Sequence, residues 1–214
     1  GDTSALGSNV LSYEELLAAE SGDAYDYPDI DERSAAAMCY TSGTTGNPKG
    51  VVYSHRSTVL HSMAAGSGTT FGLTERDRIL PIVPMFHANA WGLPWAAPMV
   101  GCKMVLSADY RPDKMCALFR EEEVTHSAGV PTVWLTMIEH ILRTGEELGP
   151  LQQVTIGGSA APRAMIKWLL ERGIEVGHAW GMTETSPIGT CGSRPLGWED
   201  YSLEEKVDYI ARQG

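Results

Sequence analysis

The sequence has few cysteines and few basic residues, and both shortages exclude classes of protein. Its four cysteines, Cys39, Cys102, Cys116 and Cys191, are far apart and form no C-x-x-C pair, so neither a disulfide framework nor a zinc site is indicated. The 16 Lys and Arg residues are outnumbered by 27 Asp and Glu residues, giving a net charge of −11. A nucleic-acid-binding protein needs a basic face that releases counterions, so that class is excluded. We expect a protein of the reducing cytoplasm.

The sequence also lacks an uninterrupted apolar segment and a signal peptide. The longest stretch without a charged residue, 79–102, contains four prolines, so we expect a buried, broken segment and no membrane span. The first ten residues are polar and have no basic start before an apolar run. There is no initiator Met, and we therefore expect the chain to be an internal fragment of a longer one.

The beginning of the chain differs from the rest. Ser12 and Glu15 have the spacing of a capping box, which predicts a short helix through Ala19. An acidic, polar linker follows at 21–32. We therefore expect a helix and linker over residues 1–33 and one α/β domain over residues 34–214.

From residue 35 onward, short β-rich runs alternate with longer amphipathic ones. A parallel strand can return only through a crossover, so this rhythm predicts a mainly parallel sheet covered by helices on both faces. Ligands should then bind at the carboxyl ends of the strands. The predicted strands are 35–40, 50–54, 78–83, 103–106, 125–128, 153–156 and 175–178. The predicted helices are 55–65, 90–100, 112–122, 132–143, 162–172 and 203–212.

The segment Tyr40-Thr-Ser-Gly-Thr-Thr-Gly-Asn-Pro-Lys-Gly50 lies between two predicted strands and has the composition of a polyphosphate-binding loop. Its glycines let the backbone turn amides inward, its hydroxyls donate, and its lysine supplies a point charge. A Walker motif is excluded, because Pro48 and Gly50 flank the lysine. A plain hairpin remains the alternative. The candidate phosphate-binding residues are Thr41, Ser42, Gly43, Thr44, Thr45, Gly46 and Lys49.

This loop resembles the phosphate-binding signature of the adenylate-forming superfamily, which contains acyl-CoA synthetases, luciferases and the adenylation domains of peptide synthetases. Three further segments resemble motifs of that superfamily in the expected order: Pro84-Met-Phe-His-Ala-Asn-Ala-Trp91, Gly157-Gly-Ser-Ala-Ala-Pro162 and Trp180-Gly-Met-Thr-Glu-Thr185. The resemblance spans residues 40–185 and implies the large N-terminal domain of such an enzyme.

The resemblance implies roles for residues in the last two segments. Thr183 would donate to the α-phosphate of ATP, and Glu184 would ligate Mg²⁺, because a carboxylate beside phosphates needs a cation between them. Trp180 stands where the superfamily usually has an adenine-stacking Tyr. The remaining implied nucleotide-binding residues are Gly157, Gly158, Ser159, Ala179 and Gly181. Without the resemblance, Glu184 reads as a solvated helix-start carboxylate, Trp180 as core, and Gly157 to Ser159 as a strand-to-helix turn.

The resemblance also implies an acid-binding pocket. His87 would lie beside the substrate carboxylate, although a satisfied core histidine is the alternative. Trp91 is similar to the tryptophan that gates the acyl tunnel in long- and medium-chain fatty acyl-CoA synthetases. The apolar residues around it fit a pocket wall or a plain core.

The implied reaction joins a fatty acid to coenzyme A in two steps, with acyl-adenylate and pyrophosphate formed first from ATP and Mg²⁺. Lys49, His87, Thr183 and Glu184 are the expected catalytic residues. The superfamily's later Gly-Asp segment and C-terminal lysine domain are absent from this sequence, so we expect little turnover by the 214-residue chain alone. Two alternatives stay open: a non-catalytic nucleotide- or acyl-binding module and an aryl-acid-specific relative. The expected ligands are a fatty acid, ATP and coenzyme A, and peripheral membrane contact and a homodimer are left open as further interactions of the enzyme.

Overall fold

The computed structural model describes residues 10–23, 25–41, 46–68 and 70–212. The chain divides into two compact units, residues 1–31 and 32–214. The first contains α1 (Tyr13–Ala19). Within residues 10–23, the Ser12 side chain makes no capping hydrogen bond, so the predicted capping box is wrong. The buried Ser12 instead begins the helix through its carbonyl, which accepts from the amide of Leu16 at 3.0 Å.

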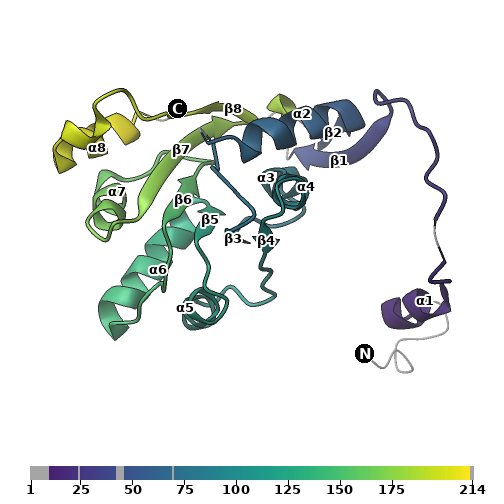
Figure 1. Cartoon of the computed structure of the whole chain (residues 1–214), viewed down its shortest axis with the longest axis horizontal. Helices are drawn as coiled ribbons and strands as arrows, with labels where there is room; N and C mark the ends of the chain where they lie inside the picture. The colour runs from purple at the N-terminus through teal and green to yellow at the C-terminus, as the bar shows by residue number, and fades with distance from the viewer. Residues whose placement is uncertain (1–9, 24, 42–45, 69, 213–214) are drawn as a thin grey trace. The chain divides into compact units, whose positions relative to one another are not determined.

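The second unit alternates strands and helices, as the sequence predicts (Figure 1). Its strands are β1 (Ala35–Thr41), β2 (Lys49–Ser54), β3 (Arg78–Pro81), β4 (Lys103–Met104), β5 (His126–Gly129), β6 (Gln153–Ile156), β7 (Glu175–Gly181) and β8 (Ile188–Cys191). Its α-helices are α2 (His55–Gly66), α3 (Ala88–Trp91), α4 (Leu93–Met99), α5 (Pro112–Glu121), α6 (Pro131–Thr144), α7 (Arg163–Leu170) and α8 (Leu203–Ile210). Two 3₁₀ turns are η1 (Thr183–Thr185) and η2 (Trp198–Asp200).

Six strands form one sheet in the order β4-β3-β5-β6-β7-β8. The first five are parallel to one another, and only β8 runs antiparallel, beside β7. The predicted α/β class and the mainly parallel sheet are confirmed. The sequence analysis missed β8, because this four-residue strand follows Pro187 and contains Gly189, both of which weaken a strand pattern.

The first two predicted strands do not join this sheet. β1 and β2 pair only with each other, as an antiparallel ribbon in which Thr41 lies opposite Lys49. The strands predicted over 35–40 and 50–54 are therefore present, but they lie outside the mainly parallel sheet. A parallel pairing would need a crossover of a dozen or more residues, and only seven residues separate Thr41 from Lys49.

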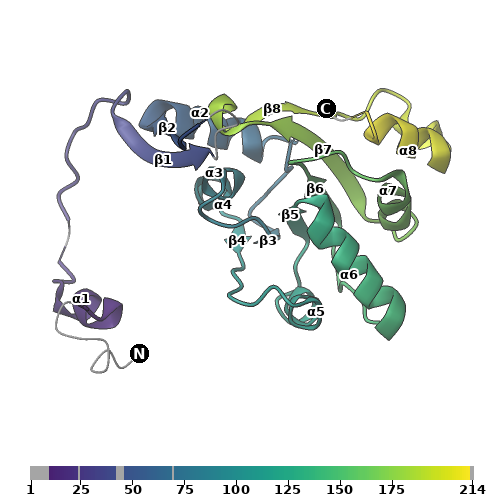
Figure 2. The same cartoon turned by 180° about the vertical axis from the view of Figure 1, so that it is seen from behind.

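Helices cover both faces of the sheet, and a separate apolar core lies under each set (Figures 1 and 2). One core lies under α5, α6 and α7, and the other under α2, α3 and α4. Neighbouring residues of β3 serve different cores: Leu80 packs in the first and Ile79 in the second, as strand alternation requires. The sheet is thus buried on both faces, and its carboxyl edge is left for binding.

The helix predicted over 90–100 is wrong as a single element. Residues 88–91 form one turn with positive φ angles of 46°, 52°, 49° and 56°, and Gly92 follows at 75°. A right-handed helix cannot continue through that turn, so α4 begins anew at Leu93 with Pro94 in its first turn. Left-handed backbone outside glycine is costly, and such positions concentrate at functional sites.

Among the described residues, no helix is long and apolar enough to cross a bilayer.

Candidate functional site

A cleft lies at the carboxyl ends of β3, β6 and β7. The sheet order places these ends along one edge, and each strand runs directly into a segment that enters the cleft. Its lining includes predicted residues from three separate segments. They are His87 and Trp91, Gly157 and Gly158, and Ala179, Trp180, Gly181 and Thr183.

Glycines keep this cleft open where backbones approach closely. A Cβ on Gly157 would lie 3.1 Å from the Ala179 carbonyl oxygen and 3.3 Å from Trp91 Cη2. Gly158 has φ +82°, which disfavours any side chain there. A Cβ on Gly181 would collide with the backbone of Pro187. The site therefore depends on glycines, which have no side chain, at the ends of β6 and β7.

Trp91 and His87 lie at the two ends of the left-handed turn. Trp91 is 8% exposed, with its indole against Gly157. His87 is exposed, so the alternative of a satisfied core histidine does not hold for it. The turn thus puts a buried apolar wall and an accessible imidazole on the same cleft.

Trp180 is 44% exposed, which excludes ordinary core packing. Its ring lies over Gly189 of β8, where a Cβ would be 2.5 Å from Trp180 Cζ3. One side of the indole therefore packs against Gly189, and the ring remains accessible at the cleft. A planar, apolar group could stack there.

Thr183 and Glu184 lie on η1, directly after β7. Hydrogen bonds across the turn hold it. Thr185 Oγ1 accepts from the Met182 amide at 2.9 Å and donates to the Pro187 carbonyl oxygen at 2.5 Å. The Glu184 side chain is exposed and is not among the described residues that line the cleft. Glu184 thus follows the cleft residue Thr183 in sequence, and its side chain is open to solvent.

The β1–β2 ribbon contacts this turn. Tyr53 of β2 donates its hydroxyl to the Thr183 carbonyl oxygen at 2.6 Å. Burial raises the pKa of Tyr53 to about 12, and the nearby Cys39 and Glu184 charges add to the effect. Lys49 is exposed at the start of the same strand. The strand that carries the predicted phosphate-binding lysine is thus tied to the turn that carries the predicted metal ligand.

The remaining predicted site residues do not line the cleft or are not described by the structure. Thr41, Gly46 and Ser159 are described but do not line the cleft. Residues Ser42, Gly43, Thr44 and Thr45, the centre of the predicted phosphate loop, lie outside the described residues.

The structure adds cleft residues that sequence reasoning missed. They are Phe71, Ala88, Thr155, Met182, Pro187 and Ile188. Met182 lies within a recognised segment, and Thr155 lies on a predicted strand two residues before Gly157. Both residues could therefore have been predicted as cleft residues from their positions in the sequence. Phe71 and Ile188 carried no such signal, because their place depends on tertiary packing.

His61 of α2 holds the left-handed turn from behind. Its Nε2 lies 2.9 Å from the Trp91 carbonyl oxygen, and a Cβ on Gly92 would run into its ring. Burial lowers the pKa of His61, and the bond to Trp91 opposes this only in part. A neutral imidazole that donates through Nε2 fits these contacts.

Glu184 fits a magnesium ion as a single carboxylate ligand. Mg²⁺ prefers oxygen ligands and is commonly bound by one or two carboxylates together with substrate phosphates. The exposed Glu184 side chain, next to the cleft residue Thr183, offers one carboxylate of this kind. The residues present therefore fit the ion if a phosphate supplies further oxygens.

A second cluster with metal-ligand side chains, Cys116, His140 and Glu146, is better explained as an ion-pair network. Arg120 Nη1 lies 3.1 Å from Glu146 Oε2, and Arg143 Nη2 lies 3.3 Å from His140 Nδ1, so two guanidinium groups oppose a dication. Burial also raises the pKa of Cys116 to about 11, which disfavours the thiolate that a metal needs.

The fold and the cleft belong to a known class. Residues 3–211 match the family described as AMP-binding enzyme, and the chain belongs to that family.

Two curated proteins are similar in sequence to this chain. The medium-chain-fatty-acid–CoA ligase of Ectopseudomonas oleovorans is 46% identical over 215 residues, covering 100% of this chain and 39% of that protein. The 3-methylmercaptopropionyl-CoA ligase of Ruegeria pomeroyi is 48% identical over 187 residues, covering 86% of this chain and 34% of that protein. The chain thus spans less than two fifths of these curated relatives.

A solved structure has the same fold. The o-succinylbenzoate coenzyme A synthetase of Bacillus subtilis, in complex with ATP and a magnesium ion, superimposes with a TM-score of 0.72 at 25% identity. The match covers 86% of this chain and 38% of that one.

Proposed function

We propose that this chain is the nucleotide-binding part of an acid–CoA ligase that forms an acyl-adenylate from ATP and a fatty acid. The observation that carries the proposal is that three recognised segments, far apart in sequence, line one cleft, while the ribbon bearing Lys49 is bonded to its border. The relatives named above are coenzyme A ligases, which supports this reaction class. The proposal assigns catalysis to residues 34–214 and leaves 1–33 as a helix and a linker.

ATP would lie with its adenine on Trp180 and beside Gly157 and Gly158, whose missing side chains leave space for a flat ring. Ala179 and Gly181 would border the ring, with Ser159 beyond it. The triphosphate would then extend past Thr183 toward Lys49 and the loop Thr41 to Gly46. This path follows the contact between β2 and η1.

In the first step, a carboxylate oxygen of the acid forms a bond to the α-phosphorus, and the bond to pyrophosphate breaks. Both reactants are anions, so stabilisation of charge lowers the barrier most. Thr183 would donate to the α-phosphate, Lys49 would neutralise the leaving pyrophosphate, and His87 would orient the carboxylate. Mg²⁺ held by Glu184 would supply further positive charge to the phosphate oxygens. The thiol sulfur of coenzyme A then attacks the acyl carbon, and AMP leaves.

The acid's chain would meet the apolar wall at Trp91 and Phe71. We propose a fatty acid with Trp91 as the gate, although the two relatives named above differ in their acids. Replacing Trp91 by Ala should change the ratio of kcat/KM for octanoate and palmitate more than it changes the affinity for ATP. An unchanged ratio would remove the gate, and preference for benzoate over alkanoates would make the protein an aryl-acid ligase.

Pyrophosphate release tests the reaction. The full-length protein, given Mg·ATP, coenzyme A and acids from octanoate to stearate, should release pyrophosphate, and the 214-residue chain alone should release little. Binding of ATP without pyrophosphate release from any acid by the full-length protein would make it a non-catalytic binding module. The free state of all four cysteines supports our proposal that the enzyme works in the reducing cytoplasm. Fractionation with membranes tests peripheral membrane contact by the enzyme, and sedimentation tests whether it forms a homodimer.

A further inference from the structure

Tyr53 is buried between the ribbon and η1 and joins them through one hydrogen bond. The hydroxyl donates to the Thr183 carbonyl oxygen at 2.6 Å, across 130 residues of sequence. The side chain is 6% exposed, so water competes little for this bond. The sequence analysis gave Tyr53 no role.

The bond acts on the peptide unit that carries Glu184. Because a peptide is planar, fixing the Thr183 carbonyl also fixes the amide and Cα of Glu184. Thr183 accepts a second, longer bond from the Ser186 amide at 3.4 Å, so Tyr53 supplies the shorter of the two constraints. The orientation of the first peptide of η1, between Thr183 and Glu184, therefore depends on the Tyr53 hydroxyl.

Tyr53 is itself held firmly. Ser54, the next residue, caps α2: its Oγ accepts from the Ser57 amide at 3.1 Å, and the Ser57 hydroxyl accepts from the Ser54 amide at 3.1 Å. The amide of His55 is bonded to the Ser34 carbonyl oxygen at 3.1 Å. The phenol is thus carried on a rigid junction and can serve as a fixed reference for the turn.

The two atoms themselves fix the direction of this bond. A carbonyl oxygen can only accept, so the hydroxyl must donate in this bond. Lys49 lies four residues earlier on the same strand, which is ~13 Å along an extended chain.

We propose that Tyr53 is a positioning residue, which sets the Glu184 carboxylate relative to Lys49 so that both meet the triphosphate and its Mg²⁺. This inference rests on the proposed function, since it assumes that Mg·ATP binds here. Tyr53 touches neither the substrate nor the ion and acts through the Thr183–Glu184 peptide.

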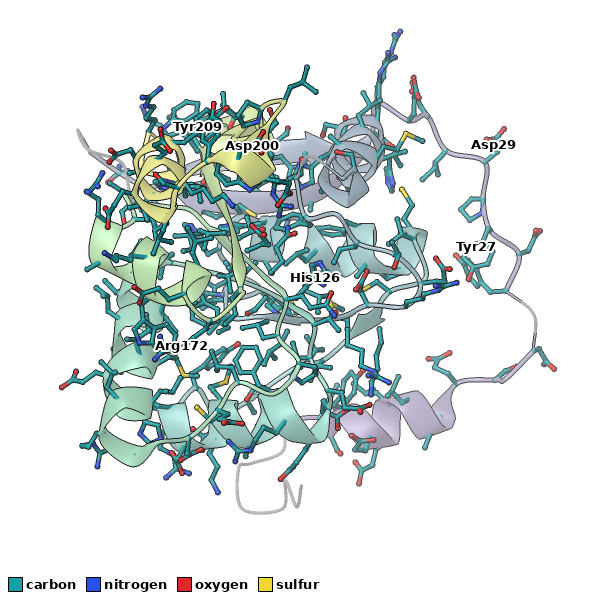
Figure 3. All side chains as sticks on the ribbon, turned by 60° about the vertical axis from the view of Figure 1, so that its left-hand side comes forward. Tyr27, Asp29, His126, Arg172, Asp200 and Tyr209 are labelled. Carbon is teal, nitrogen blue, oxygen red and sulfur yellow. The ribbon has the colours of Figure 1, made fainter. Side chains whose placement is uncertain are left out.

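The test is Tyr53→Phe, which removes only the hydroxyl, with nucleotide affinity measured by calorimetry both with Mg²⁺ and with EDTA. We expect about a tenfold loss of ATP affinity in Mg²⁺, equivalent to about 1.4 kcal/mol. In EDTA the loss should stay below about twofold, because Glu184 then has no ion to present. Tyr209→Phe on α8, at the position labelled in Figure 3, is the matched control and should change neither value.

A double variant separates positioning from general stability. In a Glu184→Gln background, Tyr53→Phe should cause no further loss, because the carboxylate that it orients is gone. Equal losses with and without Mg²⁺, additive losses in the double variant, or no loss at all would each overturn the inference while leaving the proposed function intact. Failure of the wild-type chain to bind ATP at all would overturn both.

Discussion

One methyl group at position 157 should disturb both the fold and the cleft. In Gly157→Ala, the new Cβ lies 3.1 Å from the Ala179 carbonyl oxygen and 3.3 Å from Trp91 Cη2. Optimal contacts between carbon atoms are ~3.5–4.0 Å, and both distances are tighter than nearly all Cβ contacts in proteins, so one or both neighbours must move by a few tenths of an ångström. The Ala179 oxygen is backbone of β7, and the indole is the part that can yield.

Overpacking of this kind costs about 1–3 kcal/mol. For a domain of this size, 1 kcal/mol lowers Tm by about 2–4 °C, so we expect Gly157→Ala to lower Tm by about 2–12 °C. The added methyl group should also weaken ATP binding, because Gly157 lines the cleft where we propose that the adenine lies. Thermal unfolding and calorimetry measure the two effects.

Gly68→Ala is the matched control, since no atom of the described residues lies within 4 Å of its added Cβ. Trp91→Phe provides the decisive comparison, because a phenyl ring lacks Cη2. In the Trp91→Phe background, Gly157→Ala should lower the free energy of unfolding by at least ~0.5 kcal/mol less than it does in the wild-type background. Strict additivity, or a Gly157→Ala variant as stable as the control, would refute the contact.

Three further predictions concern the exposed Glu184, Lys49, and the histidines His61 and His126. Glu184→Gln should reduce Mg²⁺-dependent ATP binding and adenylate formation without changing Tm, because its side chain is exposed; unchanged activity would remove Glu184 from the site. Lys49→Gln should weaken ATP binding by about 1.5–3 kcal/mol, the usual contribution of a hydrogen bond to a charged group, and an equal affinity would remove Lys49 from the phosphate path. Burial lowers the pKa values of His61 and His126, so the free energy of unfolding in urea should fall as pH drops below ~6.5, where the unfolded chain takes up protons first. His61→Gln should flatten that dependence, and an unaltered slope would contradict the assignment.

The sheet could be predicted from the sequence because its signals are local. The strands β4, β5 and β6 are each followed by an amphipathic helix, and the five parallel strands β3 to β7 fell within or close to their expected ranges. The same rhythm misplaced β1 and β2, since periodicity cannot show whether a strand pairs with the sheet or only with its neighbour. His126, near the centre of Figure 3, lies buried at the start of β5 beside Asp77, a pairing that only the folded sheet creates.

The cleft was predictable only where its residues lie in recognisable segments. His87, Gly157 and Trp180 all belong to such segments and line it together. The left-handed turn before Gly92 was not predictable, because alanine and tryptophan disfavour positive φ, and Asn89 is the one residue of this turn that tolerates it. Tyr53 was missed for a related reason: its partner is 130 residues away.

A crystal structure of this chain with Mg²⁺ and a non-hydrolysable ATP analogue tests the central claim most directly. Our account predicts the adenine against Trp180 and Gly157, with the triphosphate between Lys49 and a Mg²⁺ ion held ~2.0–2.1 Å from a Glu184 oxygen. Nucleotide bound outside this cleft, or a triphosphate that reaches Lys49 or Glu184 but not both, would contradict it.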